Sequence, residues 1–152
     1  MKGTEMTSTL ETQTGSRPRR IARRLMAVVA AVVAALVVWA VARLGLGLDV
    51  REPQWSGTAR DVAAVNIVVL SAVASAAGWA LLAVLERFSA RAGRWWARIA
   101  AVVAVASLVG PLTVPGITAS SRVVLGLLHL VVGAVLIPLL YRSSPSRKEQ
   151  VR

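Results

Sequence analysis

The chain has no cysteine among its 152 residues. This excludes disulfide bonds, thiolate metal sites and dithiol redox chemistry. It also has no glycine-rich phosphate-binding loop, no histidine and carboxylate cluster with metal-ligand spacing, and no plausible Ser/His/Asp set. The sequence therefore predicts a protein that is not an enzyme and that holds no metal and no cofactor.

Charge is nearly missing from four long stretches, in which Arg98 of the third is the one charged residue. The longest, Val62–Leu85, contains 24 residues without a charged side chain. As a helix it measures about 36 Å, against about 30 Å for the hydrocarbon core of a bilayer. Three further apolar runs lie at about 25–42, 96–113 and 123–141. The pattern predicts an all-α integral membrane protein, a single four-helix bundle occupying residues 21–142.

The two ends of the chain are polar. Residues 1–20 are rich in Thr and end in arginines, and they are expected to form a disordered, basic N-terminal tail. Residues 143–152 form a basic C-terminal tail. The first apolar run, with Ala40-Val41-Ala42 near its end, also admits a cleaved signal peptide. A retained helix is preferred, because the run is longer than a signal core and follows a long polar segment.

Prolines and glycines mark the expected breaks. Pro18 disfavours helix before about Ile21. Residues 43–61 are expected to form a mixed loop. Gly110-Pro111 is expected to bend the end of the third span, and Pro138 to kink the fourth.

The formal net charge is +11, and the basic residues are unevenly placed. Fourteen of the eighteen Lys and Arg lie within residues 2–24, 86–98 and 142–152, and four lie in the 43–61 and 113–122 loops. Because basic residues favour the cytoplasmic side, both termini are expected in the cytoplasm of a multi-pass protein of the cell membrane. The expected partners are the bilayer and its anionic lipid headgroups, not nucleic acid.

His129 is the one histidine of the sequence and lies well inside the fourth apolar run. It shares a helical face with Gly126 and Gly133, small residues that let another backbone come close. An ionisable group at this depth is a candidate for a proton relay or ligand site. The favoured interpretation is a neutral histidine that is hydrogen-bonded to a neighbouring helix, because no carboxylate lies at the same depth.

Other intramembrane polar residues fall in the half of the spans expected to face outward. Asn66, Ser71 and Ser107 join His129 in this group. They suggest a small polar site open to the outside, although on a helical wheel Asn66 points away from Ser71. Ordinary hydrogen bonding between helices is the favoured explanation.

Small residues are expected to mark close helix packing. The candidates for this role are Ser75, Gly78, Gly126 and Gly133.

No span carries a deep Asp or Glu, which argues against a small four-span proton-coupled exporter with an acid in its first helix. Four features occur together: an Arg-rich entry to the first span, Gly78–Arg87, Ser107–Leu112, and Leu128-His129-Leu130 leading to Val135–Pro138. In that order, over 23–142, the chain resembles an uncharacterised family of small actinobacterial four-span integral membrane proteins. The resemblance implies the four-helix topology and supplies no catalytic residues.

The expected function is that of a small polytopic inner-membrane protein of unknown activity. It would act through helix–helix contacts with a membrane protein partner or with a second copy of itself. The alternative is a small transporter or channel element that uses the outward-facing polar site with His129.

Overall fold

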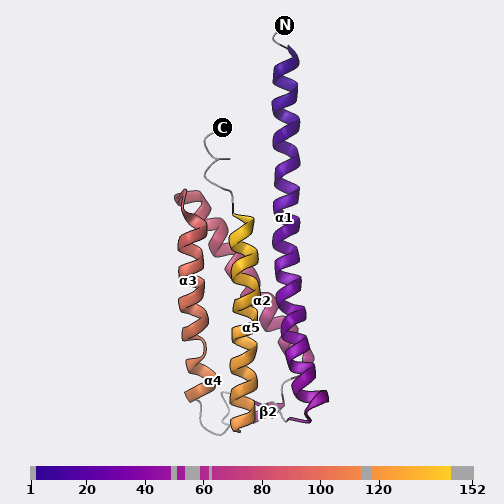
Figure 1. Cartoon of the computed structure of the whole chain (residues 1–152), viewed down its shortest axis with the longest axis vertical. Helices are drawn as coiled ribbons and strands as arrows, with labels where there is room; N and C mark the ends of the chain where they lie inside the picture. Colours follow the sequence, from indigo (N-terminus) through magenta and orange to yellow (C-terminus); the bar gives the residue numbers. More distant parts are fainter. Residues whose placement is uncertain (1–2, 49–50, 54–58, 62, 114–117, 145–152) are drawn as a thin grey trace.

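The computed structural model describes residues 3–48, 51–53, 59–61, 63–113 and 118–144, and it is dominated by helices (Figure 1). In chain order the elements are α1 (Gly3–Ala40), the π-helix η1 (Val41–Gly45), β1 (Arg51–Pro53), β2 (Ala59–Asp61), α2 (Ala64–Phe88), α3 (Ala92–Ala106), α4 (Val109–Thr113) and α5 (Ala119–Ser143). The long helices run alternately up and down. We call the end that carries β1 and β2 the ribbon end, and the end with the α2–α3 connection the turn end.

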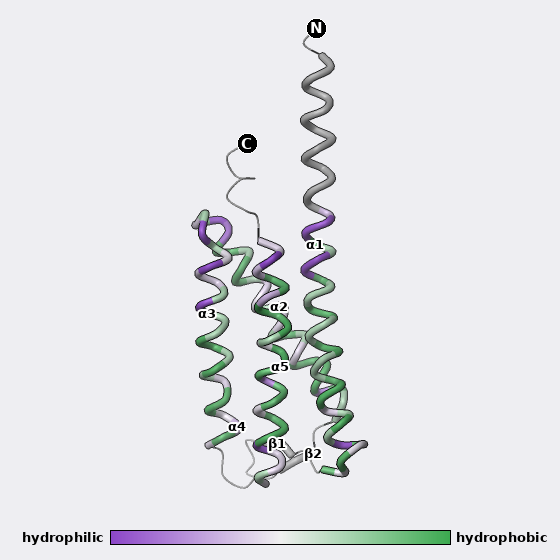
Figure 2. Tube along the Cα trace, in the orientation of Figure 1, coloured by the Kyte–Doolittle hydropathy of each residue, from purple (hydrophilic) through white to green (hydrophobic). Residues whose placement is uncertain are grey.

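Four segments of the described chain are long and apolar enough to cross a membrane. They are Pro18–Gly45, Ala64–Phe88, Ala92–Thr113 and Ala119–Ser143. Figure 2 shows hydrophobic residues along most of each segment and hydrophilic residues gathered at the turn end. The prediction of a helical protein with four spans is confirmed at this level, and the segments extend the expected runs by a few residues at most ends.

Residues 1–20 were expected to form a disordered tail, but α1 is continuous from Gly3 and contains Pro18. A proline inside a helix removes one hydrogen bond and costs about 3 kcal/mol. Once the apolar part of α1 is formed, however, each further helical residue is added without a new nucleation step. Propagation from the apolar segment therefore accounts for a helix where composition alone indicated a tail.

The expected loop at 43–61 also contains regular structure. Beyond α1 the chain widens into η1, where the Leu46 amide donates to the carbonyl of Val41, five residues earlier, at 3.0 Å. Gly47 then turns the chain with a φ of +61°, a conformation that glycine adopts without strain. The strands β1 and β2 follow as an antiparallel pair, with Arg51 opposite Asp61.

The third span is interrupted between α3 and α4, at Ser107 and Leu108. Pro111 lies four residues beyond Ser107, and a proline ring clashes with the carbonyl four residues before it. The bend therefore falls one turn before the expected Gly110-Pro111 position. By contrast, α5 passes through Pro138 as one continuous helix.

The four spans are arranged as a ring, in which each packs on the next along the chain and α5 packs back on α1. The α1–α5 contact is the most extensive, followed by α1–α2, while α2 and α5 touch only slightly. On α1 a stripe of alanines (Ala27, Ala31 and Ala35) is almost completely buried. These small side chains let the larger residues of α5, such as Leu128 and Leu136, approach the α1 backbone.

Candidate functional site: a lateral cavity between α2, α3 and α5

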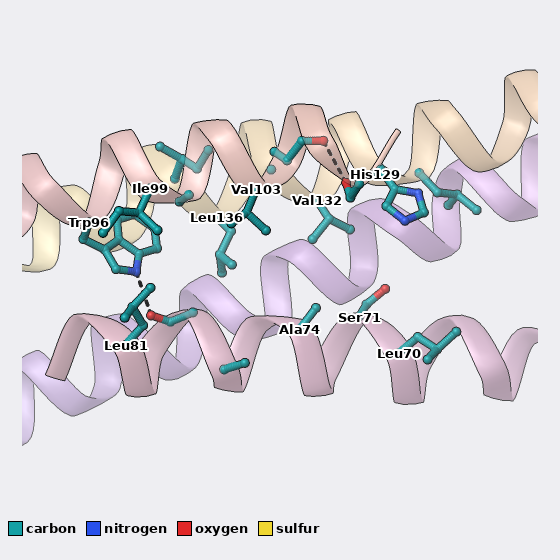
Figure 3. Close-up of a pocket in the computed structure, with 18 of the residues that line it drawn as sticks. Leu70, Ser71, Ala74, Leu81, Trp96, Ile99, Val103, His129, Val132 and Leu136 are labelled. Carbon is teal, nitrogen blue, oxygen red and sulfur yellow. Dashed lines mark hydrogen bonds between the residues drawn. The ribbon is translucent and has the colours of Figure 1, made fainter. Parts of the chain in front are cut away.

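A cavity of about 570 Å³ lies between α2, α3 and α5 (Figure 3). Along α2 its lining extends from Ile67 to Leu81, and along α3 from Trp96 to Ser107. Most of the lining is aliphatic, and no charged arginine, lysine or carboxylate belongs to it. The helix α1 contributes none of the lining, so the cavity lies on the side of the bundle away from it.

The cavity opens sideways, between α2 and α3. Leu70 on α2 is 60% exposed and Val103 on α3 is 59% exposed, and both line the cavity. Ala74 and Ala77 lie along the same rim of α2 and are exposed as well. The third span is also the least covered of the four. If the spans lie in a bilayer, the mouth of the cavity faces the lipid.

Trp96 lies at the turn end of the cavity and is only 1% exposed. Its indole N–H donates to the carbonyl of Gly78 at 2.7 Å, which joins α3 to α2. A Cβ at Gly78 would lie at ordinary contact distance, 3.7 Å from Trp96 and 3.4 Å from Leu136, so both side chains pack closely beside the Gly78 backbone. Figure 3 shows Trp96 and Leu81 together at this end.

His129 lies toward the other end, on the same side as Leu70 and Ser71 (Figure 3). Its Nδ1 is 2.7 Å from the carbonyl oxygen of Leu125, one turn earlier on α5. A carbonyl only accepts hydrogen bonds, so Nδ1 carries the proton and Nε2 of the neutral ring is an acceptor. The favoured interpretation expected a hydrogen bond to a neighbouring helix, but this hydrogen bond stays within α5.

Ser71 and Ser107 line the same cavity as His129. Ser71 is 8% exposed, and the Ser107 hydroxyl donates to the Ala104 carbonyl at 2.7 Å beside the break in α3. The structure therefore brings three of the four candidate polar residues together. Asn66, on another face of α2, does not line the cavity, in agreement with its position on the helical wheel.

The four candidate packing residues differ in how closely they are approached. Ser75 is fully buried, and its hydroxyl oxygen has no hydrogen-bond partner. A Cβ at Gly133 would lie 3.2 Å from the Cβ of Ala104, so α5 and α3 come close there. Gly126 is looser, since its nearest neighbour would be a Leu108 methyl carbon at 3.9 Å.

One polar cluster lies outside the cavity and was not anticipated from the sequence. Arg24 of α1 is 7% exposed, and its guanidinium contacts the carboxylate of Glu86 on α2 at 2.5 Å. The same guanidinium donates from Nε to the Ser143 hydroxyl of α5 at 3.3 Å. The available signal was helical spacing, because Arg24 continues the stripe of Ala27 and Ala31, whereas Arg23 is exposed.

A bundle of four helices, each long and apolar enough to cross a membrane, has the architecture of a small polytopic membrane protein. A family of unknown function (DUF6069) matches residues 15–146, and the chain belongs to this family. No curated protein and no solved structure matches the chain. The resemblance to an uncharacterised family, stated from the motifs, is confirmed to that extent.

Proposed function

We propose that this chain is a non-enzymatic protein of the cell membrane, with both termini in the cytoplasm, that acts by contacts made within the bilayer at the lateral cavity. The observation that carries the proposal is the cavity mouth between α2 and α3. It is apolar, open sideways and placed on the least covered span. An actinobacterial source, which the resemblance implies, is part of the same proposal.

The charges at the turn end support the proposed orientation. Arg91, Arg94 and Arg98 recur along one side of α3, with the Arg98 guanidinium 5.4 Å from the centre of the Trp95 ring. Arginine and tryptophan together are typical of a membrane interface, where they meet anionic headgroups. By spacing, this side of α3 is opposite the face that lines the cavity.

A transporter or channel element is the second candidate. One observation favours it, because His129, Ser71 and Ser107 share a single cavity. A path for ions or polar solutes must offer polar groups along its length. Toward Trp96 and Leu136 the lining is apolar, apart from backbone atoms, so contacts within the bilayer are the better-supported function.

The test is site-specific photocrosslinking in native membranes. A photoreactive amino acid replaces Val103 at the mouth or, as the matched control, Val33, an exposed valine of α1 that does not line the cavity. Discrete adducts to a second copy, a defined lipid or an identified membrane protein are expected from position 103 and not from position 33. Identical adduct patterns from the two positions, or none at position 103, would overturn the proposal.

A further inference from the structure

We propose that the cavity binds a neutral amphiphile with one long hydrocarbon chain, which donates a hydrogen bond from its polar end to Nε2 of His129. This deepens the proposed function by naming the class of ligand, and it rests on that function. The width of the cavity, the absence of charge in its lining and the hydrogen bonding of His129 each support part of it.

The width selects a chain in preference to a helix. From Ile67 to Leu81 the lining covers 14 residue steps of α2, or about 21 Å along the helix axis. A volume of about 570 Å³ over that length corresponds to a width of about 6 Å for the centres of water-sized atoms, or about 9 Å between the surfaces of the lining side chains. An α-helix with its side chains is about 10–12 Å across, whereas non-bonded carbon atoms lie about 4 Å apart. A single extended hydrocarbon chain fits this space, and a partner helix does not.

The lining excludes a charged headgroup from the interior of the cavity. A phosphate or carboxylate taken out of water needs a cation or several hydrogen-bond donors close by. No arginine or lysine lines the cavity, although the chain as a whole has 18 such residues. The basic side chains lie at the ends of the spans. The polar end of the ligand is therefore neutral.

His129 determines the hydrogen-bonding character of that end. Because Nδ1–H donates to the Leu125 carbonyl, Nε2 of the neutral ring offers an acceptor to the ligand. Ser71 and Ser107 line the same half of the cavity, and Trp96 at the far end already donates to Gly78. A ligand with a hydroxyl at one end places it near His129 and its chain toward Trp96.

The positions of the polar and apolar residues also determine which way the ligand points along the bundle. The polar residues of the cavity lie toward the ribbon end, and its Trp96 end lies toward the turn end. In the proposed orientation the hydroxyl enters from the outer leaflet, and the chain runs across the middle of the bilayer. The lateral mouth lets the ligand enter from lipid without crossing water.

The probe for the test is hexadecanol that carries a photoreactive diazirine near its chain end. The full chain is reconstituted in phosphatidylcholine vesicles, labelled, and mapped by mass spectrometry. Labelling is expected to saturate, to fall on residues of α2 and α3, and to be competed by unlabelled hexadecanol at least tenfold better than by hexadecane or hexadecyl phosphate. Equal competition by hexadecyl phosphate would refute the claim that the polar end of the ligand is neutral. Equal competition by hexadecane would refute the claim that the ligand donates a hydrogen bond to His129.

Two variants of α2 separate occupation of the cavity from general contact with lipid. Ala74→Phe places a ring in the exposed rim of the cavity, while Ala76→Phe adds the same ring at an exposed position outside its lining. The first is expected to abolish saturable labelling and the second to preserve it. His129→Leu is expected to weaken binding of hexadecanol by about three- to tenfold and to leave that of hexadecane unchanged. Non-saturable labelling that is equal in the two phenylalanine variants would overturn the inference.

The outcomes also separate this inference from the proposed function. Adducts from position 103 to a second copy or to an identified membrane protein, with no saturable labelling by hexadecanol, would leave contacts within the bilayer standing and refute the ligand class. The same adduct pattern from positions 103 and 33 would refute the proposed function itself.

Discussion

Arg24 and Glu86, separated by 62 positions in the chain, meet as an ion pair between α1 and α2. Ser143 of α5 receives a hydrogen bond from the same guanidinium and in turn donates to the Leu140 carbonyl at 2.7 Å. Three of the four spans are thus linked at the turn end by one buried arginine.

Replacing Glu86 with alanine leaves the buried Arg24 without its counter-ion. Breaking a buried pair from one side is expected to lower the free energy of unfolding by about 3 kcal/mol. Replacing both residues with leucine is expected to recover most of that loss, because no isolated charge remains. The measurement is denaturant unfolding in detergent micelles, followed by circular dichroism. Arg23→Ala, at an exposed position, is the control and is expected to change little. A Glu86→Ala variant as stable as this control would contradict the structural role of the pair.

Alanine at the two glycines of α5 is expected to have different effects. At Gly133 a Cβ would lie 3.2 Å from Ala104, so Gly133→Ala forces α3 and α5 apart and is expected to cost about 1 kcal/mol. Gly126→Ala has room and is expected to be neutral or slightly stabilising, because alanine favours helix. The double variant Gly133→Ala with Ala104→Gly is expected to restore stability. Equal effects at the two glycines would show that α3 does not approach α5 closely at Gly133.

Loss of the imidazole is expected to have little effect on stability. The His129 ring is exposed and hydrogen-bonds only within α5, so His129→Leu is expected to change the free energy of unfolding by less than about 1 kcal/mol. Proton conductance in liposomes is expected to be absent from both the unmodified protein and the variant at all pH values. A conductance or solute uptake that disappears in the variant would instead support the transporter function.

Orientation is tested by labelling cysteines introduced into the cysteine-free chain. An impermeant thiol reagent added to intact cells is expected to label a cysteine at Ser56, between the first two spans. It is not expected to label one at Ser89, in the α2–α3 connection. The physical reason is the excess of arginine at the turn end, which favours the cytoplasmic side. The reverse labelling pattern would invert the orientation of the bundle.

The positions of the four spans could be predicted from the sequence because long uncharged runs have few stable alternatives to helix. The position of the break in the third span was less predictable. The bend was predicted at Gly110-Pro111, but the ring of Pro111 conflicts with the carbonyl of Ser107, so the helix breaks one turn earlier. The helical start of α1 was not predicted, because the polar composition of residues 1–20 was judged as if the segment were isolated. In the structure this segment continues the helix of the first span.

The polar residues of the candidate site could be predicted from the sequence, but the shape of the cavity and its apolar lining could not. Depth and residue type identified Ser71, Ser107 and His129, and helical spacing separated Asn66 from Ser71. The shape and apolar lining of the cavity depend on how α2, α3 and α5 pack together, and the sequence of one helix does not determine that packing. The Arg24–Glu86 pair likewise depends on how two helices pack. Arg24 continues the spacing of Ala27 and Ala31, which was an unused signal that it faces inward, and only the packing of α1 on α2 shows which carboxylate it meets.

The largest packing surface of α1 is supplied by α5, and Arg24 reaches a residue 119 positions further along the chain. In the proposed membrane location, the alanine stripe of the first span therefore faces lipid until α5 has been synthesised. Arg24 meets Glu86 once α2 packs on α1, and Ser143 joins them only when α5 closes the ring.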